Sequence, residues 1–358
     1  MYGATRYPLT RVVSRHCCAK ACTATNSSMF LSRRGNATAA LSAKGSKGQM
    51  VTHRTSKKQE QKMKMSGSIH TNGRTVYLNG SFLPEQDARI SVFDRGFLFA
   101  DAVYEVSSVL QGKLLDFDGH VKRLERSLEA IQMPMPLTAD AFLQIHRRLI
   151  AENSLEEGVV YLQITRGNAG DRNFLPTPQA EATVVLFTQK MQLVENPKAK
   201  TGIRVVSIPD QRWKRCDIKT TQLLYQSLSK MNAKALGVDD AWMLDSHDNV
   251  TEGTSNNAFL VLADGTIVTK SITGTDILHG ITRAAVVRVA AEMDMQLQER
   301  AFSLKEVHTA TEAFSTSASS FVMPVVELDG VQIGDGKPGP VACRLREIYI
   351  QESLKRAV

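Results

Sequence analysis

The sequence changes character near Arg74, and this boundary limits the folded part of the chain to the residues that follow it. Residues 1–74 contain 14 lysines and arginines but a single acid, Glu60, which gives them a net charge of +13. The remaining residues carry a net charge of −5. Blocks of apolar residues with strand or helix spacing begin only after the boundary, so the folded body is predicted to start at residue 74.

The basic segment, residues 1–73, has the composition of an organelle-targeting peptide. It is rich in serine, threonine, alanine and arginine, and it lacks the continuous apolar core of a secretory signal. We therefore predict a disordered tail that acts as a transit peptide, and a location in a mitochondrion or plastid. The alternative is a solvated arm on a cytoplasmic protein, with a second start at Met63 or Met65.

Composition excludes several classes of protein. With 42% hydrophobic and 22% charged residues the chain is typical of a globular protein. No apolar run reaches the roughly 18 residues of a membrane-spanning helix, and the mildly acidic body lacks the basic stripe of a nucleic-acid-binding protein. Only Cys216 and Cys343 belong to the body, and no cysteine or histidine cluster has metal-ligand spacing, so we expect no metal site.

The body divides into two domains of unequal size, and we predict an α/β protein. Residues 74–191 are predicted to form a small α+β domain, which begins with a hairpin around Asn79-Gly80 and contains two amphipathic helices. Residues 192–202 are polar, include Pro197, and are the predicted linker. Residues 203–358 are predicted to form a larger domain of strands and helices that ends in a terminal helix.

Individual residues give weak indications of chemistry. The patterns GxSxG, HExxH and Walker A are absent, which argues against the commonest hydrolases, metalloproteases and P-loop enzymes. Lys219 lies between a predicted strand and a helix start, where a desolvated amine would act as a nucleophile, although a solvated surface lysine is the plainer interpretation. Glu252 could face a ligand or cap a helix, and Gly280-Ile281-Thr282 opens a helix that could bind an anion.

Together these segments resemble the D-amino-acid aminotransferases. The motifs are DRGFLFADAVYEV (94–106), HVKRL (120–124), DIKxxxLL (217–224), VTEGxSxNxF (250–259), ILxGITR (277–283) and PVxExDG (324–330). They occur in the family's order and extend over about residues 75–340. The resemblance implies a pyridoxal-phosphate enzyme of fold type IV, a superfamily that includes branched-chain aminotransferases and aminodeoxychorismate lyases, with a β pseudo-barrel in the larger domain.

The resemblance also implies roles for the residues that bind the cofactor. Lys219 matches the lysine that forms a Schiff base with pyridoxal 5′-phosphate and then moves the substrate proton. Glu252 matches the partner of the pyridine nitrogen, and Arg123 matches the arginine that holds the phosphate. The remaining matches are Leu278 beneath the ring and the phosphate contacts Ile281, Thr282, Ser317 and Ala318. Ala318 offers only a backbone N–H where relatives often have a hydroxyl.

Recognition of the substrate carboxylate follows the family pattern only in part. Tyr104 matches the family's tyrosine, and the family's Arg-x-His pair comes from the other subunit, which implies a homodimer. Arg172 matches the arginine if the alignment is shifted by one residue, and is either a carboxylate ligand or a surface charge. In that shifted alignment Phe174 stands at the histidine position, and without the shift Asn173 stands there.

The predicted function is a transaminase that follows a ping-pong mechanism, with a D-amino acid such as D-alanine and a 2-oxo acid such as 2-oxoglutarate as substrates. The segment RWxRCDIK (212–219) favours this branch of the family. The alternatives are a branched-chain L-amino-acid or (R)-amine transaminase, an aminodeoxychorismate lyase, and a non-catalytic binding relative. Retention of Lys219, Glu252 and Arg123 together argues against the last of these.

Overall fold

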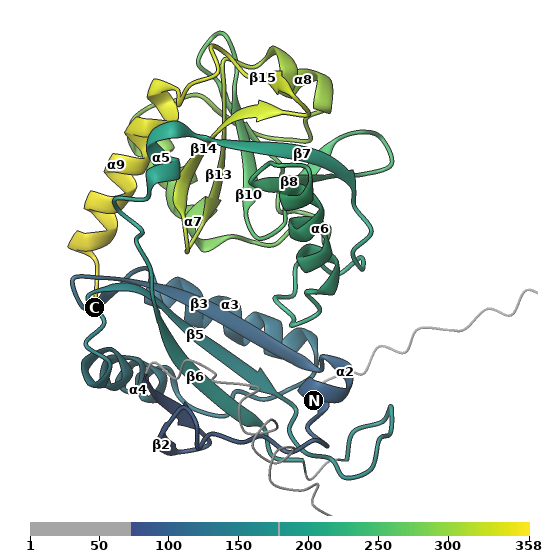
Figure 1. The fold of residues 1–358 in the computed structure, drawn as a ribbon, viewed down its shortest axis with the longest axis vertical. Helices are drawn as coiled ribbons and strands as arrows, with labels where there is room; N and C mark the ends of the chain where they lie inside the picture. The colour runs from purple at the N-terminus through teal and green to yellow at the C-terminus, as the bar shows by residue number, and fades with distance from the viewer. Residues whose placement is uncertain (1–72, 178–179) are drawn as a thin grey trace, which may run out of the picture. The chain divides into compact units, whose positions relative to one another are not determined.

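The computed structural model describes residues 73–177 and 180–358, all of which belong to one compact unit of the chain (Figure 1). The predicted targeting tail lies outside the described residues, apart from Gly73. Within the described residues, no helix is long and apolar enough to cross a bilayer.

The first part of the body forms an antiparallel sheet of six strands in the order β2-β1-β6-β5-β3-β4. The strands are β1 (Thr75–Leu78), β2 (Ser81–Pro84), β3 (Ala102–Leu110), β4 (Lys113–Leu114), β5 (Glu157–Thr165) and β6 (Thr183–Lys190). The predicted hairpin is confirmed, because Asn79 and Gly80 join β1 to β2. Both have positive φ values, 45° and 91°, as a two-residue hairpin turn of type I′ requires.

Two helices cover one face of this sheet, α3 (Phe117–Ala130) and α4 (Ala139–Glu152), and a short helix α2 (Arg95–Phe99) precedes β3. The apolar faces of α3 and α4 pack on the sheet in one hydrophobic core. Side chains alternate along β3, so that Val103 and Glu105 lie on the helix side while Tyr104 and Val106 lie on the opposite face. This alternation places Tyr104 toward the rest of the molecule.

The second part of the body forms a curled, mixed sheet of nine strands in the order β12-β11-β10-β13-β14-β7-β8-β9, with β15 paired to β14. The strands are β7 (Ile203–Pro209), β8 (Asp240–Leu244), β9 (Val250–Gly253), β10 (Asn257–Val261), β11 (Ile267–Thr269), β12 (Leu297–Glu299), β13 (Glu312–Ser317), β14 (Phe321–Leu328) and β15 (Val331–Gln332). Its buried strands contribute to two separate hydrophobic clusters. The α/β fold predicted from the sequence is confirmed.

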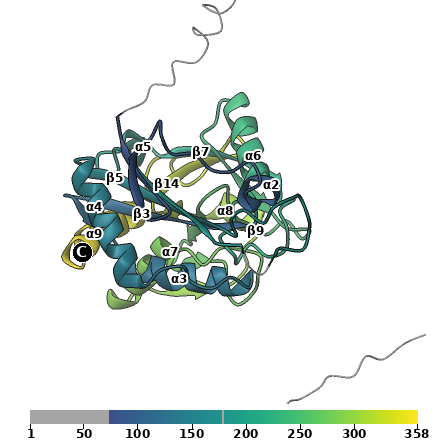
Figure 2. The same ribbon diagram turned by 90° about the horizontal axis from the view of Figure 1, so that it is seen from below.

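Helices α5 (Pro197–Thr201), α6 (Leu224–Ala235), α7 (Ile281–Glu292), α8 (Leu304–Thr309) and α9 (Pro340–Lys355) complete the body. In the view of Figure 2, α7 lies beside α3, and the contact is close. A Cβ added to Gly119 in α3 would lie 3.1 Å from the Ile281 side chain at the start of α7. Gly119 therefore allows the two helices that line the functional pocket to approach each other.

The terminal helix α9 fixes the two sheets relative to each other. Arg346 is buried and donates hydrogen bonds to the carbonyl of Ser320, just before β14, and to that of Val322 within β14, at 2.6 and 2.9 Å. The same guanidinium donates to the carbonyls of Leu193 and Val194, which connect the sheets. Tyr349 donates to Asp116, the residue before α3, at 2.9 Å. Elements of both sheets are thus tied to one helix.

Candidate active site

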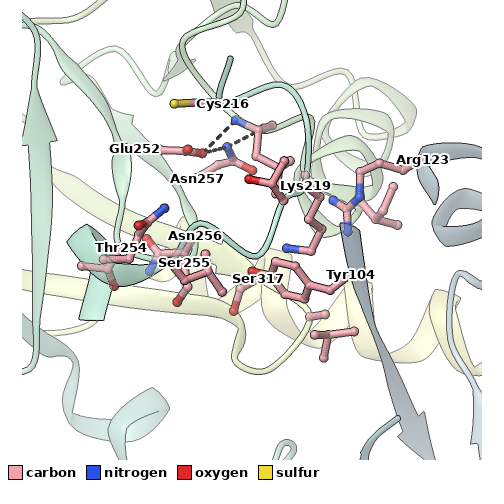
Figure 3. Close-up of a pocket in the computed structure, with 18 of the residues that line it drawn as sticks. Tyr104, Arg123, Cys216, Lys219, Glu252, Thr254, Ser255, Asn256, Asn257 and Ser317 are labelled. Carbon is pink, nitrogen blue, oxygen red and sulfur yellow. Dashed lines mark hydrogen bonds between the residues drawn. The ribbon is translucent and has the colours of Figure 1, made fainter. Parts of the chain in front are cut away.

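One pocket is lined by every predicted site residue except Arg172. Its lining comes from β3 and α3 on one side, and from β9, β13, the start of α7 and the loop after β7 on the other. Charged groups of both signs converge there. Charged side chains are rarely buried unless they are paired, so this concentration marks the pocket as a candidate site. Figure 3 shows Lys219 in the middle of the pocket, with Glu252 and Arg123 at opposite ends of the view.

The backbone on both sides of Lys219 is fixed by the small sheet. The Tyr104 N–H donates to the Lys219 carbonyl at 3.0 Å, and Thr220 forms a β-bridge with Val103. The side-chain amine lies 4.1 Å from the centre of the Tyr104 ring. A cation over an aromatic face is stabilised by the ring's quadrupole. The amine of Lys219 is thus held inside the pocket, beside the tyrosine predicted to contact substrate.

Glu252 is buried at the opposite end of the pocket from Arg123, and both of its oxygens accept hydrogen bonds. Oε2 accepts from the Asn257 side-chain amide at 3.0 Å and from the Leu278 backbone N–H at 3.1 Å, while Oε1 contacts Arg212. Burial raises the pKa of the Glu252 carboxyl, and the Arg212 guanidinium opposes this rise. These three donors orient the carboxylate as an acceptor.

Arg123 is buried on α3 and is oriented by Glu105 of β3. Its Nε and Nη2 donate to the two Glu105 oxygens at 2.8 and 2.7 Å, and Nη1 donates to the His279 carbonyl at 3.0 Å. His120 contacts the same carboxylate at 2.7 Å. Three of the five guanidinium N–H donors are therefore used, and two remain for an anion in the pocket.

The first turn of α7 provides further donors. Within the described residues, no side chain caps this helix, and the backbone N–H groups of Ile281 and Thr282 have no acceptor. Such groups, together with the helix dipole, favour a phosphate. The last residue of β13 adds the Ser317 hydroxyl, and in the loop that follows, the Ala318 carbonyl accepts a hydrogen bond from the Ser108 hydroxyl at 2.6 Å. Thr316 contributes a buried hydroxyl that has no partner among the described residues.

These groups fit pyridoxal phosphate. Arg123, the start of α7 and the Ser317 loop form a cationic, donor-rich end that matches a phosphate, and Glu252 forms an anionic end that matches a protonated ring nitrogen. Lys219 lies between these ends with its amine in the pocket. Gly280 is required here, since an added Cβ would lie 2.0 Å from Asn257 Oδ1. The cofactor predicted from the sequence therefore has a suitable set of residues.

Arg172 lies outside this pocket, on the loop between β5 and β6. Its guanidinium carbon is 4.9 Å from the centre of the Phe99 ring and 5.3 Å from that of Phe174. The loop is anchored by the buried Arg95, which donates to the carbonyls of Asn173 and Phe174 and pairs with Asp101 at 2.8 Å. Arg172 is thus exposed at the surface of its own chain and does not line the pocket that holds Lys219.

Several residues that shape the site were not predicted from the sequence as site residues. Glu105 and Arg212 each pair with a predicted residue, and Asn257 orients Glu252. One signal was available, because Glu105 is the one charged residue in strand β3 and a buried acid requires a partner. Trp213 also lines the pocket and is 39% exposed, whereas Trp242 is fully buried and donates to the Ser315 hydroxyl at 3.1 Å.

Comparison with known proteins identifies the family. Residues 102–328 match the model of the amino-transferase class IV family. The chain is a class IV aminotransferase. It is 35% identical over 272 residues to a D-alanine aminotransferase of Staphylococcus aureus (strain MSSA476), a match that covers 76% of this chain and 95% of the relative. A D-alanine aminotransferase of Listeria monocytogenes serotype 4b (strain F2365) is 32% identical over 281 residues, 78% of this chain and 96% of that protein.

Solved structures agree with this assignment. The crystal structure of a T.th. branched-chain amino acid aminotransferase with pyridoxamine 5′-phosphate superposes with a TM-score of 0.73 at 26% identity, over 79% of this chain and 95% of that chain. The class IV aminotransferase described here is therefore a fold type IV enzyme that depends on pyridoxal phosphate and acts on amino and 2-oxo acids.

Proposed function

We propose that this aminotransferase moves the amino group of a D-amino acid, such as D-alanine, to a 2-oxo acid, such as 2-oxoglutarate, in two half-reactions. The observation that carries the proposal is the arrangement of Lys219 in one pocket with Glu252 and Arg123. Similarity to the D-alanine aminotransferases over 76% of the chain supports the D-amino acid as donor.

Each of these residues has a role that its position suits. Arg123, the N–H groups of Ile281 and Thr282, and the Ser317 loop would bind the cofactor phosphate, with Leu278 beside the ring. Glu252 would accept a hydrogen bond from the ring nitrogen. When bound, pyridoxal phosphate supplies an electron sink for the bond that breaks at the substrate's Cα. Lys219 would take the proton from that carbon and deliver it to C4′ of the cofactor, which is general acid–base catalysis by a positioned amine.

A spectroscopic titration tests the proposed function. The purified protein, loaded with pyridoxal phosphate, is mixed separately with D-alanine and with L-leucine while the visible absorption of the bound cofactor is followed. We expect the band to disappear with D-alanine and to persist with L-leucine. A response to L-leucine alone would move the protein to the branched-chain alternative, and a protein that takes up no cofactor would contradict the proposed function.

We also propose that the active enzyme is a homodimer. Leu224, Leu228 and Met231 follow one face of α6 at spacings of four and three residues, and each is more than half exposed. Phe97 and Phe174 are also exposed, and the Phe174 ring lies beside Arg172. Apolar surface of this kind is typical of an interface between subunits. In such a dimer Arg172 and Tyr104 would bind the substrate carboxylate in sites formed by two chains.

Mixed dimers test this role of Arg172. Arg172→Ala alone is expected to raise the KM for D-alanine about 10- to 100-fold, which is the loss of affinity expected when a hydrogen bond to a charged group is removed. Mixing Arg172→Ala subunits with inactive Lys219→Ala subunits should then restore roughly one quarter of the wild-type activity at low D-alanine, because half of the dimers are mixed and each has one intact site. No recovery on mixing, although dimers exchange, would contradict an arginine that acts across the interface.

Finally, we propose that residues 1–73 direct the enzyme to a mitochondrion or plastid. The support is their charge of opposite sign to the body and their near absence of acids. Fusion of residues 1–73 to a fluorescent protein tests this, and a signal spread through the cytoplasm would contradict it.

A further inference from the structure

Arg212 joins the buried Glu252 to the partly buried Asp210 at the Glu252 end of the pocket. Its Nε and Nη2 form a two-pronged contact with Asp210, at 2.9 and 2.7 Å, and its Nη1 contacts Glu252 Oε1. Only 6% of the Arg212 side chain is exposed. Burial favours a lower pKa for Arg212, but the two carboxylates raise it, so the guanidinium stays charged.

The hydrogen bonds of Glu252 leave it one free acceptor position. A carboxylate can accept about four hydrogen bonds. Asn257 and the Leu278 N–H occupy both positions of Oε2, and Arg212 occupies one position of Oε1. The remaining lone pair, on the oxygen that Arg212 contacts, is therefore available to a ring nitrogen in the pocket.

The charge on Arg212 bears on the protonation of Glu252, and therefore on any proton that Glu252 would share with a ring nitrogen. Burial favours the neutral form of Glu252, and a neutral acid would donate to the ring nitrogen and leave it unprotonated. A guanidinium in contact with Oε1 opposes this, because it stabilises the anion more than it repels a cation farther away. The other titratable groups near the cluster are Asp210, which partners Arg212, Tyr225, Asp276, and Cys216, a thiol whose pKa burial raises to about 12.

We propose that Arg212 is a positioning residue that holds Glu252 as an anion, so that the proton shared with pyridoxal phosphate rests on the ring nitrogen. This role depends on the proposed function, because it assumes that pyridoxal phosphate occupies the pocket. The role adds Arg212 and its partner Asp210 to the proposed site, next to Glu252.

The experiment measures the ring nitrogen directly. The protein is loaded with pyridoxal phosphate labelled with ¹⁵N in the ring, and the ¹⁵N chemical shift is recorded without substrate. The double variant Asp210→Asn/Arg212→Met removes the ion pair without leaving an unpaired Asp210, which protects the fold. Arg212→Lys retains a positive charge, and Glu252→Gln gives the reference for a site without an anion. Arg215→Met is the matched control, since Arg215 is an exposed arginine paired with Asp217 outside the pocket lining.

We expect wild type and Arg215→Met to give the shift of a protonated ring nitrogen. The ¹⁵N shift of the double variant should move toward that of Glu252→Gln. The shift of Arg212→Lys should lie between those of wild type and the double variant. The first half-reaction with D-alanine should slow at least ~10-fold in the double variant, the change that one pKa unit represents. Adding Glu252→Gln to the double variant should cause no further loss, because residues that act through one another are not additive.

Two results separate the possible failures. A double variant that binds cofactor and keeps the protonated shift would overturn the role of Arg212 while leaving the proposed function intact. A wild-type protein that takes up no labelled cofactor would overturn the proposed function, and this role with it.

Discussion

Replacing Lys219 with alanine is expected to lower the rate of transamination at least ~10³-fold, within the range that a positioned general acid–base contributes. Lys219 is the one lysine among the described residues that line the pocket, so no neighbouring amine can take its place there. The rate of the first half-reaction with D-alanine, followed by rapid mixing, measures the effect.

The control for this prediction is Lys214→Ala. Lys214 is exposed, lies five residues away on the same loop, and does not belong to the pocket lining. We expect it to retain wild-type rates. A Lys219→Ala variant that folds, binds pyridoxal phosphate and still transaminates within tenfold of wild type would show that another group moves the proton.

Replacing Glu105 with glutamine is expected to destabilise the protein and weaken cofactor binding together. Glu105 is buried and pairs with both Arg123 and His120, so the change leaves a buried guanidinium without its counter-ion. Breaking a buried ion pair costs about 3–5 kcal/mol of the free energy of unfolding. Urea unfolding measures this loss, and fluorescence titration with pyridoxal phosphate measures the loss of affinity that follows from a misoriented Arg123.

The effect of Glu105 on stability depends on pH in a known direction. Burial favours a higher pKa for Glu105, but Arg123 and His120 prevail and lower it from 4.5 to about 2. A carboxyl with a lowered pKa stabilises the folded state fully above pH 4.5, and this contribution is lost as the pH falls toward 2. The difference in unfolding free energy between wild type and Glu105→Gln should therefore shrink below pH 4.5. A constant difference from pH 7 to pH 3 would contradict the assignment.

Much of the fold could be predicted from local signals in the sequence, because turns and helices are specified by residues that are close together in the chain. Asn79-Gly80 specifies a tight turn, and β1 and β2 follow. The terminal helix was predicted from the periodicity of residues 341–354, and α9 spans Pro340–Lys355. The short helix α5 was not predicted, although Asn196 and Pro197 are a typical cap and first residue. A five-residue helix has too few residues for a periodic pattern to be visible.

The site was predicted only where the chemistry is carried by a family motif. Lys219, Glu252 and Arg123 stand in such motifs, and the fold brings them to one pocket. Arg212 and Glu105 act through partners that lie 40 and 18 residues away in the sequence. Such pairings depend on how the sheets pack, and a single sequence does not reveal them. The same holds for the proposed role of Arg172, which requires a second chain.

The two tryptophans of the chain occupy such different surroundings that the protein carries its own fluorescent reporters. Trp213 is partly exposed in the pocket lining, where bound cofactor would quench its emission, whereas Trp242 is fully buried in the core of the larger sheet. In a Trp242→Phe variant, emission would follow occupancy of the pocket without interference from the core. In a Trp213→Phe variant without cofactor it would follow unfolding alone. Ligand binding and loss of structure could then be observed separately, in the same buffer and without an added dye.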